Sequence, residues 1–248
     1  MADCSIWLYN HLMRTIIATD LHGCDQEFRE LLQKVYFNPT RDRLILLGDL
    51  FDRGDESWEV FQHVKQLKKM LGGRMILIRG NHDQLLLNTL DNRDNLRLWA
   101  FNGGLTTVNS FQSHDDDIES ARELLESTPL FFETEDYICV HAGLKSEIPG
   151  ENDPEILLWD RDVICGSYRG KLGIGGHTPL RNPVWFVPDG RALLLKEDTH
   201  LPLPDKGFIC LDTGCVFGGR LTCMVIEDEE FYVTSVRRRE GREGLMSQ

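Results

Sequence analysis

The chain has 248 residues, of which 41% are hydrophobic, which is enough for one large core. No Pro/Gly/Ser-rich linker divides it, so we expect a single domain over residues 1–248. Its net charge of −13 repels polyanions, which argues against nucleic-acid binding through a basic face. No apolar run approaches the roughly 18 residues of a membrane span and no secretory pattern opens the chain, so we expect no membrane partner and a cytoplasmic location.

Strands and helices alternate in the first part of the chain. Short apolar runs at residues 15–19, 44–47 and 75–78 predict buried strands. Helical spacing of apolar residues follows each of them, in the sets Phe28, Leu31, Leu32 and Val35, then Phe61, Val64, Leu67 and Leu71, then Leu85, Leu86 and Leu87. This β-α-β-α-β-α order predicts right-handed crossovers and a largely parallel sheet.

The second part changes character. Residues 90–129 read as polar-faced helix, with an apolar stripe of Ile118, Ala121, Leu124 and Leu125. Strand-like runs then follow at 137–140, 184–187, 192–195, 208–211, 221–226 and 231–234. Residues 227–230 predict the turn of a terminal hairpin, and residues 237–248 predict a charged tail that frays. The fold class that we expect is α/β, with two packed mixed β-sheets flanked by helices.

Polar blocks stand directly after the first three predicted strands, where open α/β sheets place their sites. They are Asp20-Leu21-His22-Gly23, Gly48-Asp49-Leu50-Phe51-Asp52-Arg53-Gly54 and Gly80-Asn81-His82-Asp83. Two further apolar runs end in His141 and His177.

These blocks carry the ligands that a pair of divalent cations needs. Asp20 and His22 are two apart, so on an extended segment both side chains point to one side. Asp49 can place one oxygen between two cations. The remaining ligand candidates are Asn81, His141 and His177. Nitrogen and oxygen ligands without thiolate suit manganese, iron or zinc.

Other polar residues receive plainer interpretations. The histidines outside the blocks are expected on the surface: His11, His63, His114 and His200. The seven cysteines form no C-x-x-C pair, and Cys139, Cys210 and Cys223 read as core residues. Cys24 either packs at a helix start or serves as a thiol ligand. Asp115-Asp116-Asp117 reads as the acidic start of a helix rather than a calcium site.

The ordered set of blocks resembles the phosphoprotein-phosphatase branch of the calcineurin-like metallophosphoesterases. Asp52-Arg53-Gly54 is the specific part, because related nucleases usually lack that arginine. The segments 99–104 and 211–214 are similar to bacterial and phage serine/threonine phosphatases, although Gly103-Gly104 could equally be a plain helix C-cap. The resemblance implies a four-layer α-β-β-α fold.

The resemblance also implies roles. The first metal would be held by Asp20, His22 and Asp49, and the second by Asp49, Asn81, His141 and His177. Substrate phosphate would meet Arg53, Arg161, His82 and Asn81. His82 would protonate the leaving group, with Asp52 orienting it. Two divalent ions are implied, most suitably Mn²⁺, with Fe or Zn as alternatives. One departure is Asp83, where the family usually has Glu.

The expected function is metal-dependent hydrolysis of phosphate monoesters by a serine/threonine phosphoprotein phosphatase, acting on a phosphorylated protein or a small phosphoester. The alternative is symmetrical hydrolysis of dinucleoside polyphosphates such as diadenosine tetraphosphate, although that branch typically has Gln where this chain has His22. A third possibility is a scaffold whose metal site has decayed. Residues 90–130 and the loop 196–205 are expected to flank the cleft and select the substrate. Nothing in the sequence indicates an oligomeric state.

Overall fold

The structure is a computed structural model that describes residues 13–239. Its centre is a pair of six-stranded sheets. The first has the order β3-β2-β1-β11-β12-β9. Its strands are β1 (Thr15–Ala18), β2 (Arg43–Leu46), β3 (Met75–Leu77), β9 (Leu201–Pro202), β11 (Arg220–Glu227) and β12 (Glu230–Arg237). The strands β1, β2 and β3 run parallel as predicted, and β11, β12 and β9 add antiparallel pairs.

The second sheet is also mixed. Its order is β4-β5-β6-β10-β7-β8, with β5, β6 and β10 parallel in the middle. Its strands are β4 (Phe131–Glu133), β5 (Tyr137–Val140), β6 (Leu172–Gly175), β7 (Val184–Phe186), β8 (Ala192–Leu194) and β10 (Phe208–Cys210).

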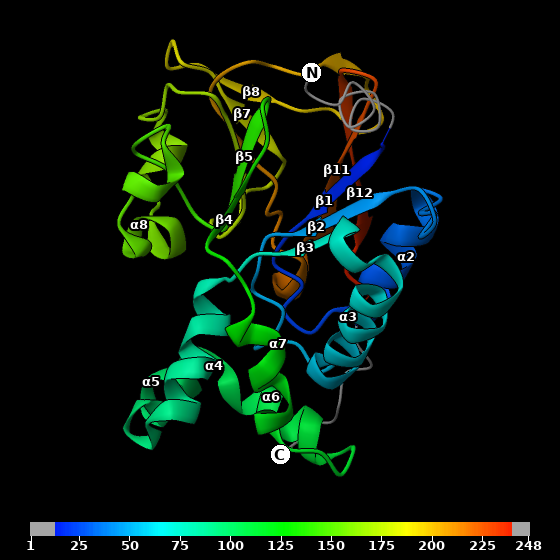
Figure 1. Cartoon of the computed structure of the whole chain (residues 1–248), viewed down its shortest axis with the longest axis vertical. Coiled ribbons are helices and arrows are strands. Elements are labelled where there is room, and N and C mark those ends of the chain that lie inside the picture. Colours follow the sequence, from blue (N-terminus) through cyan, green and yellow to red (C-terminus); the bar gives the residue numbers. More distant parts are fainter. Residues whose placement is uncertain (1–12, 240–248) are drawn as a thin grey trace, which may run out of the picture.

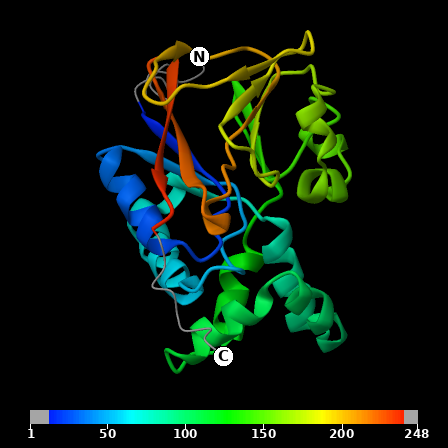
Figure 2. The ribbon, with the colours of Figure 1, turned by 180° about the vertical axis from the view of Figure 1, so that it is seen from behind.

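Helices cover the outer faces and one end of the sheets. The α-helices are α2 (Asp25–Lys34), α3 (Ser57–Leu71), α4 (Asn81–Asp91), α5 (Leu96–Phe101), α6 (Gly104–Gln112), α7 (Arg122–Glu126) and α8 (Pro154–Trp159). Short 3-10 helices are η1 (Gly72–Arg74), η2 (Arg93–Asn95), η3 (Ile118–Ala121), η4 (Pro149–Glu151), η5 (Asp162–Cys165) and η6 (Cys215–Phe217). In Figure 1, α2 and α3 lie beside the first sheet, α8 lies on the opposite side, and α4 to α7 gather below. Figure 2 shows from behind that β11 and β12 stand beside α2. None of the helices between residues 13 and 239 is both long and apolar enough to cross a bilayer.

The alternation of side chains along the strands produces the layers. In β1, Ile16 joins the core under the helices, whereas Ile17 points into the core between the sheets. In β5, Cys139 joins that central core, and Ile138 points outward to the core under α8. Three stacked apolar layers therefore separate helix, sheet, sheet and helix. The predicted four-layer α-β-β-α fold is confirmed.

The ends of several elements differ slightly from the predictions. The predicted hairpin turn is confirmed, and both of its central residues, Asp228 and Glu229, have positive φ. This conformation matches the twist of the two flanking strands. Arg237 is the last residue of β12, and Arg238 donates to Glu27 at 2.7 Å, so the predicted tail begins inside the ordered fold. Residues 240–248 of that tail lie outside the described part of the chain.

Candidate metal centre and phosphate site

The polar blocks meet at one end of the two sheets. Asp20 and Asp49 follow β1 and β2, and Asn81 opens α4 directly after β3. His141 and His177 follow β5 and β6 of the second sheet. All five are almost completely buried. The strand-to-loop boundaries of both sheets thus deliver their side chains to one place.

The first group contains Asp20, His22 and Asp49. His22 donates through Nδ1 to the Phe51 carbonyl at 2.7 Å, so its neutral ring presents an unprotonated Nε2. That nitrogen lies 3.4 Å from Asp49 Oδ2 and 4.0 Å from Asp20 Oδ1. The second oxygen of Asp20 is held by the backbone amide of His177 at 3.0 Å.

The second group contains Asn81, His141 and His177. His141 donates through Nδ1 to the Leu47 carbonyl at 2.8 Å, which leaves Nε2 unprotonated. That Nε2 lies 2.9 Å from Asn81 Oδ1 and 3.2 Å from His177 Nδ1. His177 Nδ1 is itself 2.9 Å from Asn81 Oδ1. The three converging atoms share at most one proton, an arrangement that a cation would satisfy.

Asp49 lies between the two groups. Its Oδ1 accepts from the backbone amide of His82 at 2.9 Å. Its Oδ2 is 3.4 Å from His22 Nε2 and 3.5 Å from His141 Nε2. A single carboxylate oxygen thus faces one imidazole of each group, which is the geometry of a bridging ligand.

The electrostatics of the site also fit bound cations. Burial and the neighbouring Asp20 carboxylate raise the pKa of Asp49 well above its usual value, and the same two causes act on Asp212. Burial lowers the pKa of His22 to about 3 and that of His177 to about 2, so both imidazoles are neutral at pH 7. Packed carboxylates with neutral imidazoles form a donor set that positive charge would stabilise.

Asp83 holds the backbone around Asp49. Its Oδ2 accepts from the backbone amides of Asp49 and Gly80, both at 2.9 Å, and its Oδ1 accepts from Leu50 N at 3.1 Å. The shorter Asp side chain, where the family usually has Glu, therefore still fixes the loop after β2. Sequence reasoning could not identify this contact.

His82 and Asp52 form a buried pair beside the first group. His82 Nδ1 donates to Asp52 Oδ2 at 2.7 Å, and the His82 ring lies edge-on to His22 at 4.8 Å. Asp52 also accepts from Trp99 Nε1 at 2.9 Å and from Thr107 Oγ1 at 2.7 Å. Burial raises the pKa of Asp52 to about 7, although hydrogen bonds from Thr107 and Trp99 and the charge of Arg53 favour its carboxylate form.

Sequence reasoning gave no role to Trp99 or Thr107. The only signal was that Trp99 opens the segment 99–104, which resembles the phosphatases. Thr107 carried no signal. Both hold Asp52 from helices that follow it by about fifty residues, on α5 and α6. Asp212, which follows β10 and interacts electrostatically with Asp20, also received no role.

Two arginines reach the centre. Arg53 donates through Nη1 to His22 Nε2 at 2.6 Å. Arg161 donates through Nη1 to the His177 carbonyl at 3.3 Å and to Thr178 Oγ1 at 3.2 Å. Each guanidinium therefore lies beside one of the two ligand groups.

Gly103 positions Arg53. Its φ is +103°, and its carbonyl accepts from Arg53 N at 3.2 Å. A Cβ at this position would lie 2.8 Å from Arg53 Cγ. The glycine pair therefore does more than end a helix, because Gly104 also packs directly under the Trp99 ring.

Left-handed backbone is concentrated at this centre. Residues with a Cβ and positive φ include Asp20, His22, Asp49, Asp52, Arg53 and His177. Such residues are uncommon, and they tend to cluster at functional sites because the surrounding fold must hold them there.

Cys24 and His63 lie outside the two candidate ligand groups. Cys24 is the N-cap residue of α2 and is buried near Glu27 and Cys215. Glu27 already accepts from Arg238 at 2.7 Å, so Cys24 fits helix-start packing better than ligation. The expectation that His63 lies on the surface is wrong, because its side chain is only 11% exposed and its Nδ1 lies 2.8 Å from Asp25 Oδ1.

The other minor expectations mostly hold. His114 and His200 are exposed, as expected, and His11 lies outside the described residues. Asp117 caps η3 by accepting from Glu119 N at 2.9 Å, in agreement with an acidic helix start. Cys139, Cys210 and Cys223 are buried in the cores.

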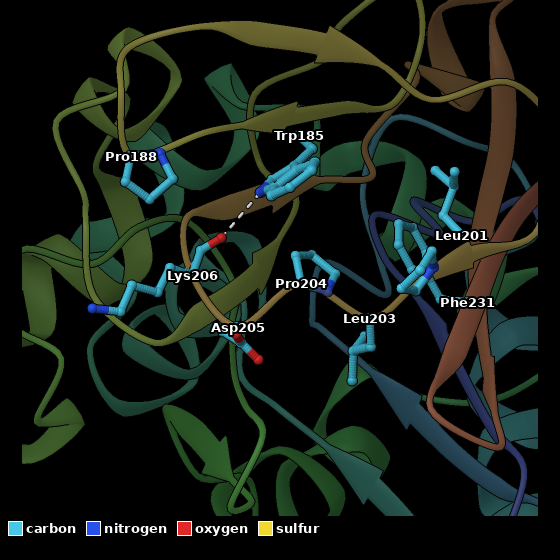
Figure 3. Close-up of a pocket in the computed structure, with 9 residues that line it drawn as sticks. Trp185, Pro188, Leu201, Leu203, Pro204, Asp205, Lys206 and Phe231 are labelled. Carbon is cyan, nitrogen blue, oxygen red and sulfur yellow. Dashed lines mark hydrogen bonds between the residues drawn. The ribbon is translucent and has the colours of Figure 1, made fainter.

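Most of the loop 196–205, which was expected to flank the cleft, lies away from the candidate metal centre. Leu201 to Lys206 line an apolar pocket of about 580 Å³ together with Trp185 and Phe231 (Figure 3). Phe231 is paired with Ile226, and Ile226 is paired with Thr15 at the start of β1. Because the candidate ligands follow the other end of β1, this pocket is at the opposite end of the sheet. Residues 90–130 do reach the site through Trp99 and Thr107.

The family model for calcineurin-like phosphoesterases matches residues 13–200. The chain belongs to this family. The symmetrical bis(5'-nucleosyl)-tetraphosphatase of Haemophilus influenzae is 29% identical over 90% of this chain and 97% of its own. Serine/threonine-protein phosphatase 1 of Salmonella typhimurium is 27% identical over 85% and 91%.

Solved structures agree on the fold of this calcineurin-like phosphoesterase. The crystal structure of a putative diadenosine tetraphosphatase has a TM-score of 0.64 and 24% identity, covering 93% of this chain and 98% of its own. A serine/threonine phosphatase from Saccharomyces cerevisiae has a TM-score of 0.62 at 16% identity, covering 94% and 82%. The chain is thus a hydrolase of the metallophosphoesterase family, with histidine and aspartate groups that could bind metal.

Proposed function

We propose that this chain is a metal-dependent hydrolase of dinucleoside tetraphosphates that cuts them symmetrically. The observation that carries the proposal is the near full-length similarity to enzymes named for that reaction, at 29% identity over 90% of the chain. This support is stronger than that for the serine/threonine phosphatase that we expected first. The reaction that we propose is water plus diadenosine tetraphosphate giving two molecules of ADP.

Two divalent cations would be held by the residues that converge at the sheet ends. Asp20, His22 and Asp49 would hold the first, and Asp49, Asn81, His141 and His177 the second. We propose Mn²⁺, because the ligands are imidazole nitrogens with carboxylate and amide oxygens and include no thiolate. When bound, such a pair activates water and neutralises phosphoryl oxygens.

The cationic side chains would orient the substrate. Arg53 contacts His22 and Arg161 contacts the His177 backbone, so each guanidinium group can bind phosphoryl oxygens next to one of the two candidate ligand groups. Asn81 and His82 complete the phosphate site. Charge that develops on the phosphoryl group in the transition state would then meet fixed donors.

His82 would move the proton. Its Nδ1 donates to Asp52, and burial lowers the pKa of His82 to about 3, so the resting ring is neutral and its Nε2 carries no proton. A neutral ring would have to take up a proton at Nε2 before it could protonate the leaving oxygen. Asp52 would stabilise the imidazolium between those two transfers.

Protein serine/threonine phosphatase activity is the second candidate. The observation in its favour is the similarity to the Salmonella enzyme over 85% of the chain. Its substrate would use the same cations and arginines. A decayed scaffold is a poor alternative, because the side chains that would hold the cations are all present in the sequence, and Asp49 clusters with His22 and also with His141 and His177.

The test compares products and substrates. Purified protein with Mn²⁺ is given diadenosine tetraphosphate or a phosphoserine peptide. We expect ADP as the nucleotide product, whereas ATP with AMP would contradict symmetrical cleavage. Turnover of the peptide without turnover of the nucleotide would replace the proposal with the second candidate.

Metal dependence is tested on stability as well as activity. Mn²⁺ at a free concentration of about 100 times its Kd should stabilise the protein by about 2.7 kcal/mol, seen as a higher Tm. Asp49→Asn should abolish this rise, whereas the matched change Asp117→Asn, at a helix cap that Asn also satisfies, should retain it. An equal rise in both variants would contradict the proposed ligand set.

A further inference from the structure

An exposed aromatic ring stands at the edge of the candidate phosphate site. Phe217 is the last residue of η6, and 64% of its surface is exposed. Its ring centroid is 5.2 Å from Cζ of Arg53. Arg53 in turn is 2.6 Å from His22 Nε2. One guanidinium therefore separates this ring from a candidate metal ligand.

The ring is presented on an ordered turn. Phe217 N donates to the Gly214 carbonyl at 3.0 Å, and Gly219 N donates to the same carbonyl at 2.9 Å. Cys215, in the same short helix, is buried. The segment also follows Asp212, whose carboxylate belongs to the electrostatics of the site. A rigid exposed aromatic residue loses little conformational entropy when it binds a ligand.

We propose that Phe217 is a stacking platform for a nucleobase of the substrate, an inference that rests on the proposed nucleotide hydrolase function. In a nucleoside polyphosphate the base lies one ribose away from the phosphate chain. With Arg53 on a phosphate, the adjacent ring of Phe217 is placed to receive that base. Every nucleobase has a π-face, so this contact favours nucleotides over other phosphoesters without selecting one base.

Another exposed aromatic residue, Trp159, is less suited to separate binding from catalysis. Its ring lies 6.1 Å from the ring of His177, so a substitution there also disturbs a candidate metal ligand. Phe217 touches Arg53 rather than a candidate ligand. It is therefore the position at which base recognition can be tested cleanly.

The experiment uses Mn²⁺-loaded protein with p-nitrophenyl phosphate as the reporter substrate. Inhibition constants are measured for ADP and for inorganic pyrophosphate, which carries phosphates but no base. In Phe217→Ala we expect the ADP constant to rise about 5-fold to 150-fold, the range for losing one stacked base. The factor by which the inhibition constant for pyrophosphate rises should be at least fivefold smaller than the factor for ADP. Phe217→Trp should restore ADP binding.

The control variant is Tyr36→Ala, an exposed aromatic residue beside Arg14 at the opposite end of the first sheet. It should leave both constants as they are in the unmodified protein. An equal change of both constants in Phe217→Ala, or a change in neither, overturns the proposal. So does an effect that appears on a phosphoserine peptide and not on ADP.

The two proposals fail in different ways. If the unmodified protein does not turn over diadenosine tetraphosphate, the proposed function fails, while the ADP constants still decide the role of Phe217. If it turns over that substrate and Phe217→Ala retains the same KM for it, only the stacking inference fails.

Discussion

Thr107 provides a sharp test of how Asp52 is held. Its hydroxyl donates to Asp52 Oδ1 at 2.7 Å and accepts from Asp52 N at 2.9 Å, and the residue is fully buried. Thr107→Val keeps the shape and removes these two hydrogen bonds, together with the 3.3 Å contact between the Thr107 hydroxyl and Ser57 Oγ. A hydrogen bond to a charged group contributes about 1.5–3 kcal/mol, and a buried amide left without a partner costs about 1–3 kcal/mol.

We therefore expect Thr107→Val to lose about 3–5 kcal/mol of unfolding free energy, read as a lower urea midpoint with an unchanged m-value. Because Asp52 orients His82, kcat for a phosphoester should also fall, by about tenfold to a hundredfold for a shift near 1 Å.

The matched control is Thr89→Val. Thr89 is also buried, but its hydroxyl only donates to the Leu85 carbonyl within α4, at 2.8 Å. Removing such a bond inside a helix should cost less than about 1 kcal/mol. If the two variants differ by less than 1 kcal/mol, or if kcat is the same in both, the account of Asp52 is wrong.

Two further predictions concern a glycine and an acid. Gly103→Ala and Gly190→Ala should each lose about 1–3 kcal/mol, because both positions have positive φ. Only Gly103→Ala should raise KM, since its Cβ would meet Arg53 while nothing lies within 4 Å at Gly190. Burial alone would raise the pKa of Asp25, but hydrogen bonds from His63 and Arg29 outweigh burial and lower it. Its contribution is thus present above about pH 4 and lost as the pH falls further, so unmodified protein and Asp25→Asn should converge in stability in acid. A constant difference down to pH 2 would argue against that pairing.

The candidate ligands were predictable because each stands within a few residues of a strand end. Asp49 and His141 needed only the apolar runs before them to be located. The residues that hold the site's side chains in place could not be predicted from strand ends. Thr107 and Trp99 meet Asp52 from helices about fifty residues further along, and only tertiary packing decides that approach.

The errors have similar causes. The loop 196–205 was expected beside the cleft, but strand register carries its residues Leu201 and Pro202 to the far end of the sheet. His63 was assigned to the surface because nothing in its own neighbourhood shows a partner, and Asp25 lies 38 residues away. The strands β4 and β9 have only three and two residues, too few for a periodic pattern.

The ligand groups draw on both sheets, since Asp20 and Asp49 follow strands of one and His141 and His177 follow strands of the other. Bound ions would therefore link the two sheets, and the candidate site could not form on one sheet alone. A chain emerging from the ribosome, or one opened by heat, would lack the complete set of candidate metal-binding side chains. The candidate site would be complete only once both sheets have packed against each other.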